Sequence, residues 1–199
     1  MKKLLQWLLV TGLLVICFYA YRIHRDVTNV LRYQPMVQKI LDENDSQSNE
    51  ELVLAMIYTE TKGKSVDVMQ SSESRTGAPN TITNSEESIR QGVEYLNQTI
   101  SEAREKGCDM WTAIQAYNFG SGYIDFVAKR GGKNTTTLAK EYSRDVLAPK
   151  LGNKTGKSYF SMYPVALLNG GQLYVNGGNI YYADQVAWNL GIMKVMSRL

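Results

Sequence analysis

The chain has 199 residues, of which 44% are hydrophobic and 21% are charged, so collagen-like, low-complexity and wholly disordered proteins are excluded. Its formal net charge is +3, and two of those charges, Lys2 and Lys3, precede the first apolar segment. The remaining chain is therefore almost neutral. A nucleic-acid-binding protein needs a basic surface, so we expect no nucleic-acid partner.

The cysteine and histidine content limits the chemistry that the chain can perform. His24 is the one histidine, and Cys17 and Cys108 are the two cysteines. Catalytic zinc sites commonly use two or three histidines, and Ser–His or Cys–His catalysis needs a histidine in the site. Two cysteines also provide no disulfide framework. We therefore expect carboxylates to carry the chemistry, with no metal ion and no cofactor.

An apolar segment near the N-terminus predicts a membrane helix. Residues 4–21 read LLQWLLVTGLLVICFYAY. A helix of this length spans about 27 Å, close to the thickness of about 30 Å of a bilayer's hydrocarbon core. Lys2 and Lys3 come before it, and its aromatic residues suit membrane interfaces. The sequence predicts a single-pass anchor over residues 1–21, with the rest of the chain outside the cytoplasm.

The alternative is a cleaved leader. A signal peptidase site needs small residues, but Phe18 stands two positions before Ala20. A lipoprotein site at Cys17 is disfavoured because Ile16 occupies a position that is normally small. We therefore favour the uncleaved anchor, followed by a stalk or first helix over residues 22–47.

The remainder, residues 48–199, is expected to form one predominantly helical domain. Ser48 and Glu51 have the spacing of a capping box in front of the apolar segment EELVLAMIYTE. The apolar spacing indicates helices over 26–44 (divided or kinked at Pro35), 50–60, 86–106, 110–119, 135–147 (stopped near Pro149) and 181–199. The Gly-, Asn- and Tyr-rich segment 150–180 predicts loops with a short hairpin.

Glu60 is the first candidate catalytic residue. Leu52, Met56 and Glu60 are spaced i, i+4, i+8, so a carboxylate ends the apolar face of the helix. Partial burial and the negative end of the helix dipole both disfavour the ionised form, which raises the pKa. A general acid working near neutral pH needs such a shift. The alternative is that Glu60 merely marks the helix end and points to water.

Polar residues that could serve the same site follow Glu60. The loop over 61–74 reads TKGKSVDVMQSSES, and its Asp67, Gln70, Ser72 and Glu73 could bond sugar hydroxyls or hold a water molecule. A later helix ends in AYNFG at residues 116–120. Taken alone, each of these segments is weak evidence, since Asn and Gly also stop helices.

Four motifs in order carry a family resemblance: Glu60, Met69-Gln70, Ala116–Gly120 and Tyr182 followed by Val186. The order over residues 48–190 resembles the soluble lytic transglycosylases and the goose-type lysozyme superfamily. The form DVMQSSES is similar to the bacterial lysozyme-like branch found in Gram-positive cell-wall hydrolases. The resemblance implies a mostly helical lysozyme-like fold and cleavage of the β-1,4 bond between N-acetylmuramic acid and N-acetylglucosamine in peptidoglycan.

The resemblance also implies roles for individual residues. Glu60 would protonate the glycosidic oxygen, and Gln70 would line the sugar subsite. Tyr117 and Asn118 would orient the acid and contact the N-acetyl group. Tyr182 matches a tyrosine that stands near the catalytic glutamate in the family.

The identity of a second carboxylate is open at this point. Glycosidases commonly pair two carboxylates, which lie about 5 to 5.5 Å apart in retaining enzymes and about 6.5 to 9.5 Å apart in inverting ones. Asp67 and Glu73 are the candidates, and either would give hydrolysis. If neither reaches the site, attack by the substrate's own hydroxyl would give the 1,6-anhydro product of a lytic transglycosylase. The chain also departs from the transglycosylase pattern: it has Thr61 where those enzymes have Ser, and Asp67-Val68 where they have Gly-Leu. Hydrolysis and transglycosylation therefore both remain open.

The sequence thus predicts a membrane-anchored peptidoglycan glycosidase that acts on glycan strands outside the membrane of a Gram-positive bacterium, with a lean towards hydrolysis. The alternative from another class is a catalytically poor wall-binding scaffold. Glu60 at the end of an apolar face favours the enzyme, because a binding module has no need of a desolvated carboxylate.

Overall fold

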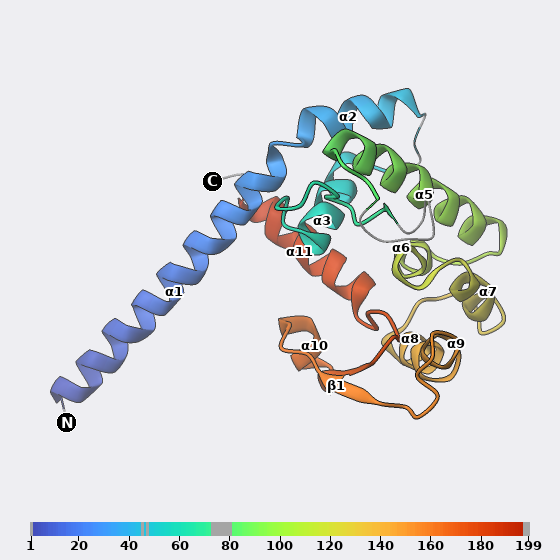
Figure 1. The fold of residues 1–199 in the computed structure, drawn as a ribbon. Helices are drawn as coiled ribbons and strands as arrows, with labels where there is room; N and C mark the ends of the chain where they lie inside the picture. The colour runs from blue at the N-terminus through green and yellow to red at the C-terminus, as the bar shows by residue number, and fades with distance from the viewer. Residues whose placement is uncertain (1, 45, 47, 73–80, 197–199) are drawn as a thin grey trace.

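A long N-terminal helix leads into a helical domain that carries one small two-stranded sheet (Figure 1). The computed structural model describes residues 2–44, 46, 48–72 and 81–196. The helices are α1 (Lys2–Leu31), α2 (Gln34–Glu43), α3 (Glu50–Glu60), α5 (Ser85–Glu105), α6 (Met110–Phe119), α7 (Gly122–Ala128), α8 (Thr136–Tyr142), the π-helical segment η1 (Ser143–Leu147), α9 (Ala148–Lys150), α10 (Pro164–Leu168) and α11 (Tyr182–Met196). The strands are β1 (Ser158–Phe160) and β2 (Gln172–Tyr174).

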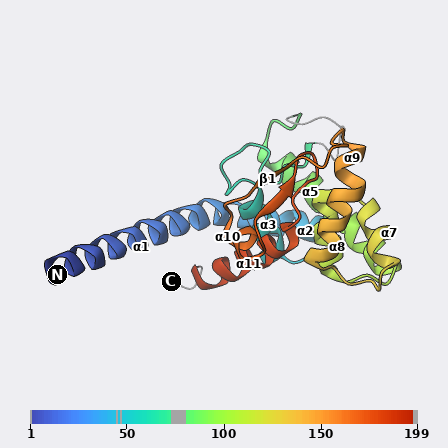
Figure 2. The same cartoon turned by 90° about the horizontal axis from the view of Figure 1, so that it is seen from below.

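Helix α1 projects from the domain, and its N-terminal half is clear of the other elements (Figures 1 and 2). Within the described chain, it is the one helix that is long and apolar enough to cross a membrane. Its C-terminal end is buried through Asp26, Val27 and Val30. The chain turns before Pro35, which lies in the first turn of α2 and confirms the expected division at this residue.

Helix α3 forms the centre of the domain. Every side chain from Leu52 to Tyr58 is buried, because α1, α2 and α11 pack around it. Its N-cap is Asn49, whose side chain accepts a hydrogen bond from the N–H of Leu52. The expected capping box at Ser48 is therefore wrong by one residue, since asparagine caps a helix as well as serine does.

Two further helical details differ from the expectations. Helix α7 begins two residues after α6, in a segment where the run Gly-Ser-Gly obscured the start of a helix. Pro149 directly follows a π-helical turn, η1, which the sequence did not indicate, and the helix ends at Lys150, one residue beyond the proline and close to the expected stop. The chain thus stays helical from Thr136 to Lys150.

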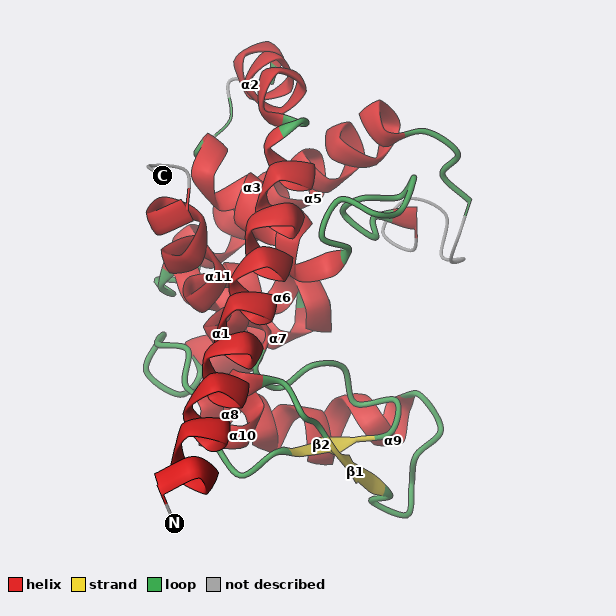
Figure 3. Ribbon diagram, turned by 90° about the vertical axis from the view of Figure 1, so that its left-hand side faces the viewer, coloured by secondary structure: helices red, strands yellow, loops and turns green. Residues whose placement is uncertain are grey.

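The segment 150–180 forms the expected hairpin together with α10, which the sequence did not reveal (Figure 3). Strands β1 and β2 are antiparallel, with Tyr159 opposite Leu173. The expected fold class is therefore confirmed: a mostly helical domain with a small hairpin region after one apolar N-terminal helix.

Candidate active site

A cleft of about 790 Å³ opens where α3, α5, α6 and the loops beside them meet. Its lining consists of Glu60, Asp67, Gln70, Ser71, Ser72, Tyr95, Tyr117, Asn118, Phe119, Gly120, Leu147, Leu151, Asn176 and Gly178. The structure therefore brings together residues from five separated segments (60–72, 95, 117–120, 147–151 and 176–178), and six of the eight residues named from the sequence line this cleft. Tyr182 is buried beneath it. Glu73 lies outside the described residues.

Glu60 places a carboxyl group at the wall of this cleft. It is the last residue of α3 and is half-buried, and its Oε1 accepts a hydrogen bond of 2.6 Å from the hydroxyl of Tyr182. Burial raises the pKa of Glu60 to about 7, with a smaller contribution from the negative charge of Asp67. The hydrogen bond from Tyr182 opposes this by stabilising the carboxylate. The carboxyl is thus poised between its two protonation states near neutral pH.

Tyr182 is held in place by a stack of tyrosine rings. The ring of Tyr117 stacks on that of Tyr182, with 6.2 Å between centroids and an angle of 9°, and Tyr95 tilts against Tyr117 at 5.4 Å. The hydroxyl of Tyr117 donates to the carbonyl of Met69 at 3.0 Å. Tyr117 therefore supports the ring of Tyr182 and also fixes the loop that carries Gln70.

Gln115 fixes the start of α11, from which Tyr182 projects. Its Oε1 accepts from the N–H of Ala183, and its Nε2 donates to the carbonyl of Asn179. Gln115 is buried on α6, one helical turn before Phe119, which lines the cleft. No motif distinguishes Gln115 in the sequence, because a single glutamine within an apolar helix has no characteristic spacing.

Asp67 is buried, and both of its carboxylate oxygens accept hydrogen bonds. Ser88 Oγ and the N–H of Ser71 donate to Oδ1, while Ser72 donates to Oδ2 through its hydroxyl at 2.6 Å and its N–H at 3.2 Å. Burial acts to raise the pKa of Asp67, but the hydrogen bonds from Ser72 and Ser88 outweigh it and hold the pKa below its usual value. Asp67 is an ionised anchor for its loop.

Gln70 and Ser72 have different surroundings although both line the cleft. Gln70 is exposed and adopts a left-handed backbone conformation with φ 49°, and its Nε2 donates to the carbonyl of Asp67. Ser72 is buried, and its hydroxyl oxygen also accepts from the N–H groups of Thr81 and Ile82. Gln70 thus faces the space that a ligand would occupy, whereas Ser72 organises the loop.

The opposite wall of the cleft depends on Asn118. Its Oδ1 accepts a hydrogen bond of 2.7 Å from the N–H of Asn179, which ties the end of α6 to the loop before α11. Gly178 in that loop has φ 65°, and an added Cβ there would lie 2.8 Å from the ring of Phe119. Glycine is therefore required for this close approach.

Tyr95, Leu147 and Asn176 are cleft residues that sequence analysis missed. Nothing local distinguishes Tyr95 from the other twelve tyrosines, and the remaining two belong to segments whose placement depends on the whole fold. Among the described residues, no group of three His, Cys, Asp or Glu side chains could hold a metal ion.

The fold and cleft define a class of protein, and the chain belongs to the lysozyme-like family, whose family model matches residues 27–190. It is 55% identical over 193 residues to pneumococcal vaccine antigen A of Streptococcus pneumoniae serotype 4, a match that covers 97% of this chain and 95% of that protein. The family resemblance stated from the motifs is therefore confirmed.

Two further relatives bear on the chemistry. The chain is 39% identical over 126 residues to the bifunctional muramidase/DL-endopeptidase CwlT of Bacillus subtilis, covering 63% of this chain and 37% of that protein. A crystal structure from Staphylococcus aureus, described as similar to lipoprotein of the NLP/P60 family, matches with a TM-score of 0.72 and 34% identity. That match covers 82% of this chain and 52% of the staphylococcal one, so this chain spans about half of it.

Proposed function

We propose that the chain is a membrane-anchored peptidoglycan glycosidase in which Glu60 is the general acid that protonates the β-1,4 bond between N-acetylmuramic acid and N-acetylglucosamine. The observation that carries the proposal is the half-buried Glu60 carboxyl, with a pKa of about 7, at the cleft wall. Membership of the lysozyme-like family and the similarity to a muramidase support the same class of substrate. Helix α1 would hold the domain outside the membrane.

The geometry suggests how the proton moves. Tyr182 donates to Oε1 of Glu60, so Oε2 is the oxygen that carries the acidic proton into the cleft. Transfer of that proton to the glycosidic oxygen lets the C1–O bond break, and the leaving sugar takes the hydroxyl. The resulting Glu60 carboxylate is then stabilised by the Tyr182 hydroxyl, which donates more strongly to a charged acceptor.

The fate of the sugar cation separates two products. A muramidase adds water, usually with help from a second carboxylate, and this is the product that we propose. Both oxygens of Asp67 already accept hydrogen bonds from Ser71, Ser72 and Ser88, so Asp67 is poorly suited to take a proton from water. This observation favours two alternatives: Glu73 as the base, or a lytic transglycosylase that uses the substrate's own hydroxyl.

The deciding experiment is mass spectrometry of muropeptides released from purified cell wall by the full-length protein in detergent. Reducing N-acetylmuramic acid ends are expected, and their loss in Glu73→Gln would assign Glu73 as the base. Products lighter by one water, with 1,6-anhydro ends, would instead make the protein a lytic transglycosylase.

The first test of the site is Glu60→Gln, which keeps an acceptor for Tyr182 but has no acidic proton. Loss of a general acid typically lowers the rate about 10²–10⁴-fold. Glu51→Gln is the matched control, because Glu51 is exposed in the first turn of the same helix and pairs with Lys194. If Glu60→Gln still clears cell wall at the rate of Glu51→Gln, the assignment is wrong. Binding without any clearing by the unmodified protein would favour the wall-binding scaffold.

A further inference from the structure

Large apolar side chains gather on the surface of the hairpin region. Five of them are exposed, and the side chains of Met162 and Leu168 are 74% and 76% accessible: Phe160, Met162, Tyr163, Leu167 and Leu168. Helix α10 packs against α11, where Trp188 is 49% accessible. We call these six residues the hairpin patch. Soluble monomers rarely expose so many neighbouring apolar side chains unless the surface binds something.

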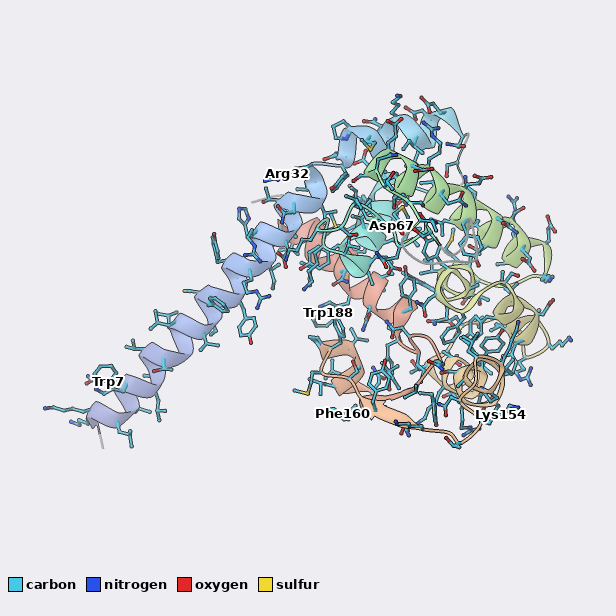
Figure 4. The ribbon with its side chains drawn as sticks, viewed as in Figure 1. Trp7, Arg32, Asp67, Lys154, Phe160 and Trp188 are labelled. Carbon is cyan, nitrogen blue, oxygen red and sulfur yellow. The ribbon has the colours of Figure 1, made fainter. Side chains whose placement is uncertain are left out.

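The hairpin patch lies on the side of the domain that faces the free half of α1. Figures 1 and 3 show β1 and α10 at the same end of the molecule as the N-terminal half of α1, and Figure 4 places Phe160 and Trp188 on this side. Helices α6 and α7 lie on the opposite side of the domain (Figure 1). If the apolar segment of α1 crosses a bilayer, the same bilayer surface lies below the hairpin patch.

The chemistry of this region matches a membrane surface. Tryptophan and tyrosine prefer the boundary between headgroups and hydrocarbon, and leucine, methionine and phenylalanine enter the outer hydrocarbon. From residue 146 to residue 183 the sequence contains no Asp or Glu, whereas Lys150, Lys154 and Lys157 are present and exposed. Figure 4 shows Lys154 at the end of the hairpin region away from Phe160 and Trp188, so this positive charge lies beside the apolar contact, where it would be attracted to anionic lipid headgroups.

We infer that the hairpin patch is a second membrane contact, which inserts into the outer leaflet of the bilayer that α1 spans. A glycan is the other candidate occupant, since sugars stack on aromatic rings. Met162, Leu167 and Leu168 offer no hydroxyl or amide to a sugar, and they make up half of the patch. The inference rests on the membrane-anchoring part of the proposed function.

This contact would fix the cleft beside the membrane. Tyr159, Tyr163 and Asn176 line a neighbouring hollow of about 280 Å³, and Asn176 also lines the catalytic cleft. This hollow connects the patch, through Tyr163, with the cleft, through Asn176. A domain held at two points, α1 and the hairpin patch, would present the cleft to glycan close to the bilayer in one orientation.

The three tryptophans of the chain allow a direct test. Full-length protein is placed in vesicles of phosphatidylglycerol and phosphatidylethanolamine that carry a spin-labelled lipid quencher near the headgroup. Three single-tryptophan versions are compared, each with the other two tryptophans changed to phenylalanine. Trp7 reports on α1, Trp188 on the hairpin patch, and Trp111 on α6 at the opposite side.

The expected result is severalfold stronger lipid quenching of Trp188 than of Trp111, together with quenching of Trp7. Met162→Ser combined with Leu168→Ser should reduce the quenching of Trp188 towards that of Trp111, and thermal unfolding monitored by circular dichroism should stay unchanged because both side chains are exposed.

Two outcomes would overturn the inference. If Trp7 is quenched but Trp188 is not, the anchor stands and the second contact does not exist. If soluble peptidoglycan fragments shift the emission of Trp188 while lipid does not quench it, the patch binds glycan. Absence of Trp7 quenching would instead show that the anchoring part of the proposed function has failed.

Discussion

At the scale of single residues, two opposing effects set the protonation of Glu60. Burial raises its pKa to about 7, and the hydroxyl of Tyr182 stabilises the ionised form through its hydrogen bond of 2.6 Å. A carboxyl buried without this bond would hold its proton too tightly for rapid transfer at neutral pH. Tyr182 is therefore a positioning residue that also adjusts the acid.

Tyr182→Phe should shift the pH dependence of activity. The protonated acid is the active form, so the unmodified protein should lose activity as the pH rises above about 7. Removing the hydroxyl removes a contact that lowers the pKa of Glu60. The alkaline limb of the pH–activity profile should therefore move to higher pH, while the maximal rate falls. Rates of cell-wall clearing between pH 5 and pH 9 provide the measurement.

Tyr123→Phe is the control for this prediction, because the hydroxyl of Tyr123 is buried but donates to Asn134. Its alkaline limb should coincide with that of the unmodified protein. An alkaline limb that stays in place or moves to lower pH in Tyr182→Phe would contradict the role given to that hydroxyl.

The same carboxyl should make the fold less stable in alkali. The pKa of Glu60 is raised in the folded state, so the folded protein binds the proton more tightly than the unfolded chain does. Glu60 therefore reduces stability as the pH rises from its unfolded value through about 7. Glu60→Gln should be more stable than the unmodified protein at pH 8, by on the order of 1–3 kcal/mol, and about equal at pH 4. Denaturant unfolding at the two pH values measures this, and a difference independent of pH would contradict it.

At the scale of elements, Asp67 organises the loop between α3 and α5. Five hydrogen bonds from serine residues converge on one buried carboxylate, and the hydroxyl of Thr61 donates to the carbonyl of Val68 in the same loop. The loop carries Gln70 to the cleft in a left-handed conformation. Its shape therefore depends on these side-chain hydrogen bonds together with the buried side chains of Val68 and Met69.

Asp67→Asn should destabilise the protein by about 2–4 kcal/mol, because an amide group would face N–H and O–H donors that now point at a carboxylate. The pKa of Asp67 is lowered, so its stabilising effect is present above the unfolded value and is lost as the pH falls through the folded one. Thermal unfolding between pH 2.5 and pH 7 should show the two proteins converging in acid.

Asp125→Asn is the matched control, since Asp125 also has a lowered pKa but is exposed beside Lys106. An exposed pair of this kind contributes little to stability because water and salt screen it. Equal losses in Asp67→Asn and Asp125→Asn would mean that the serine network does not stabilise the loop.

The sequence predicted those elements whose signal is local and repeated. The bounds of α6 and, within one residue, of α5 followed from apolar spacing. Helix α7 was missed because glycine residues obscured its start, and the π-helical turn η1 before Pro149 has no signal in the apolar spacing. Local rules place helices well but do not settle where one ends and the next begins.

The residues of the candidate site were likewise predictable only where a local pattern marked them. Glu60 could be found because a carboxylate ended an apolar helical face, and Tyr182 through its place in the order of motifs. The engagement of Asp67 by serine side chains could not be foreseen, since it needs Ser88 to reach across from another helix. Contacts between distant segments are set by tertiary packing, which spacing alone does not encode.

At the scale of the whole molecule, the joint between α1 and the domain would decide how the cleft sits relative to the membrane in which we propose that α1 is anchored. Helix α1 continues without interruption from its apolar half to the buried Val27 and Val30. Asp26 is buried at this joint, and Lys64 lies 2.7 Å from its carboxylate, with Lys62 at 3.8 Å. Gly63 between these lysines has φ 67°, and an added Cβ would lie 3.1 Å from the carbonyl oxygen of Asn29. A rigid joint transmits the direction of α1 to the domain.

Asp26→Asn should loosen this joint. Burial acts to raise the pKa of Asp26, but the hydrogen bonds from Lys64 and Arg25 hold it below its usual value, so the carboxylate stabilises the joint at neutral pH. Its neutral replacement leaves Lys64 without its partner, with an expected loss on the order of 1–3 kcal/mol. Hydrogen–deuterium exchange of the full-length protein should become faster in residues 22–31 and 61–64, while α6 keeps its protection. Glu43→Gln, which removes the same charge from an exposed pair with Arg90, should leave both segments unchanged. Equal exchange in the two variants would show that apolar packing of Val27 and Val30 alone holds the membrane helix to the domain.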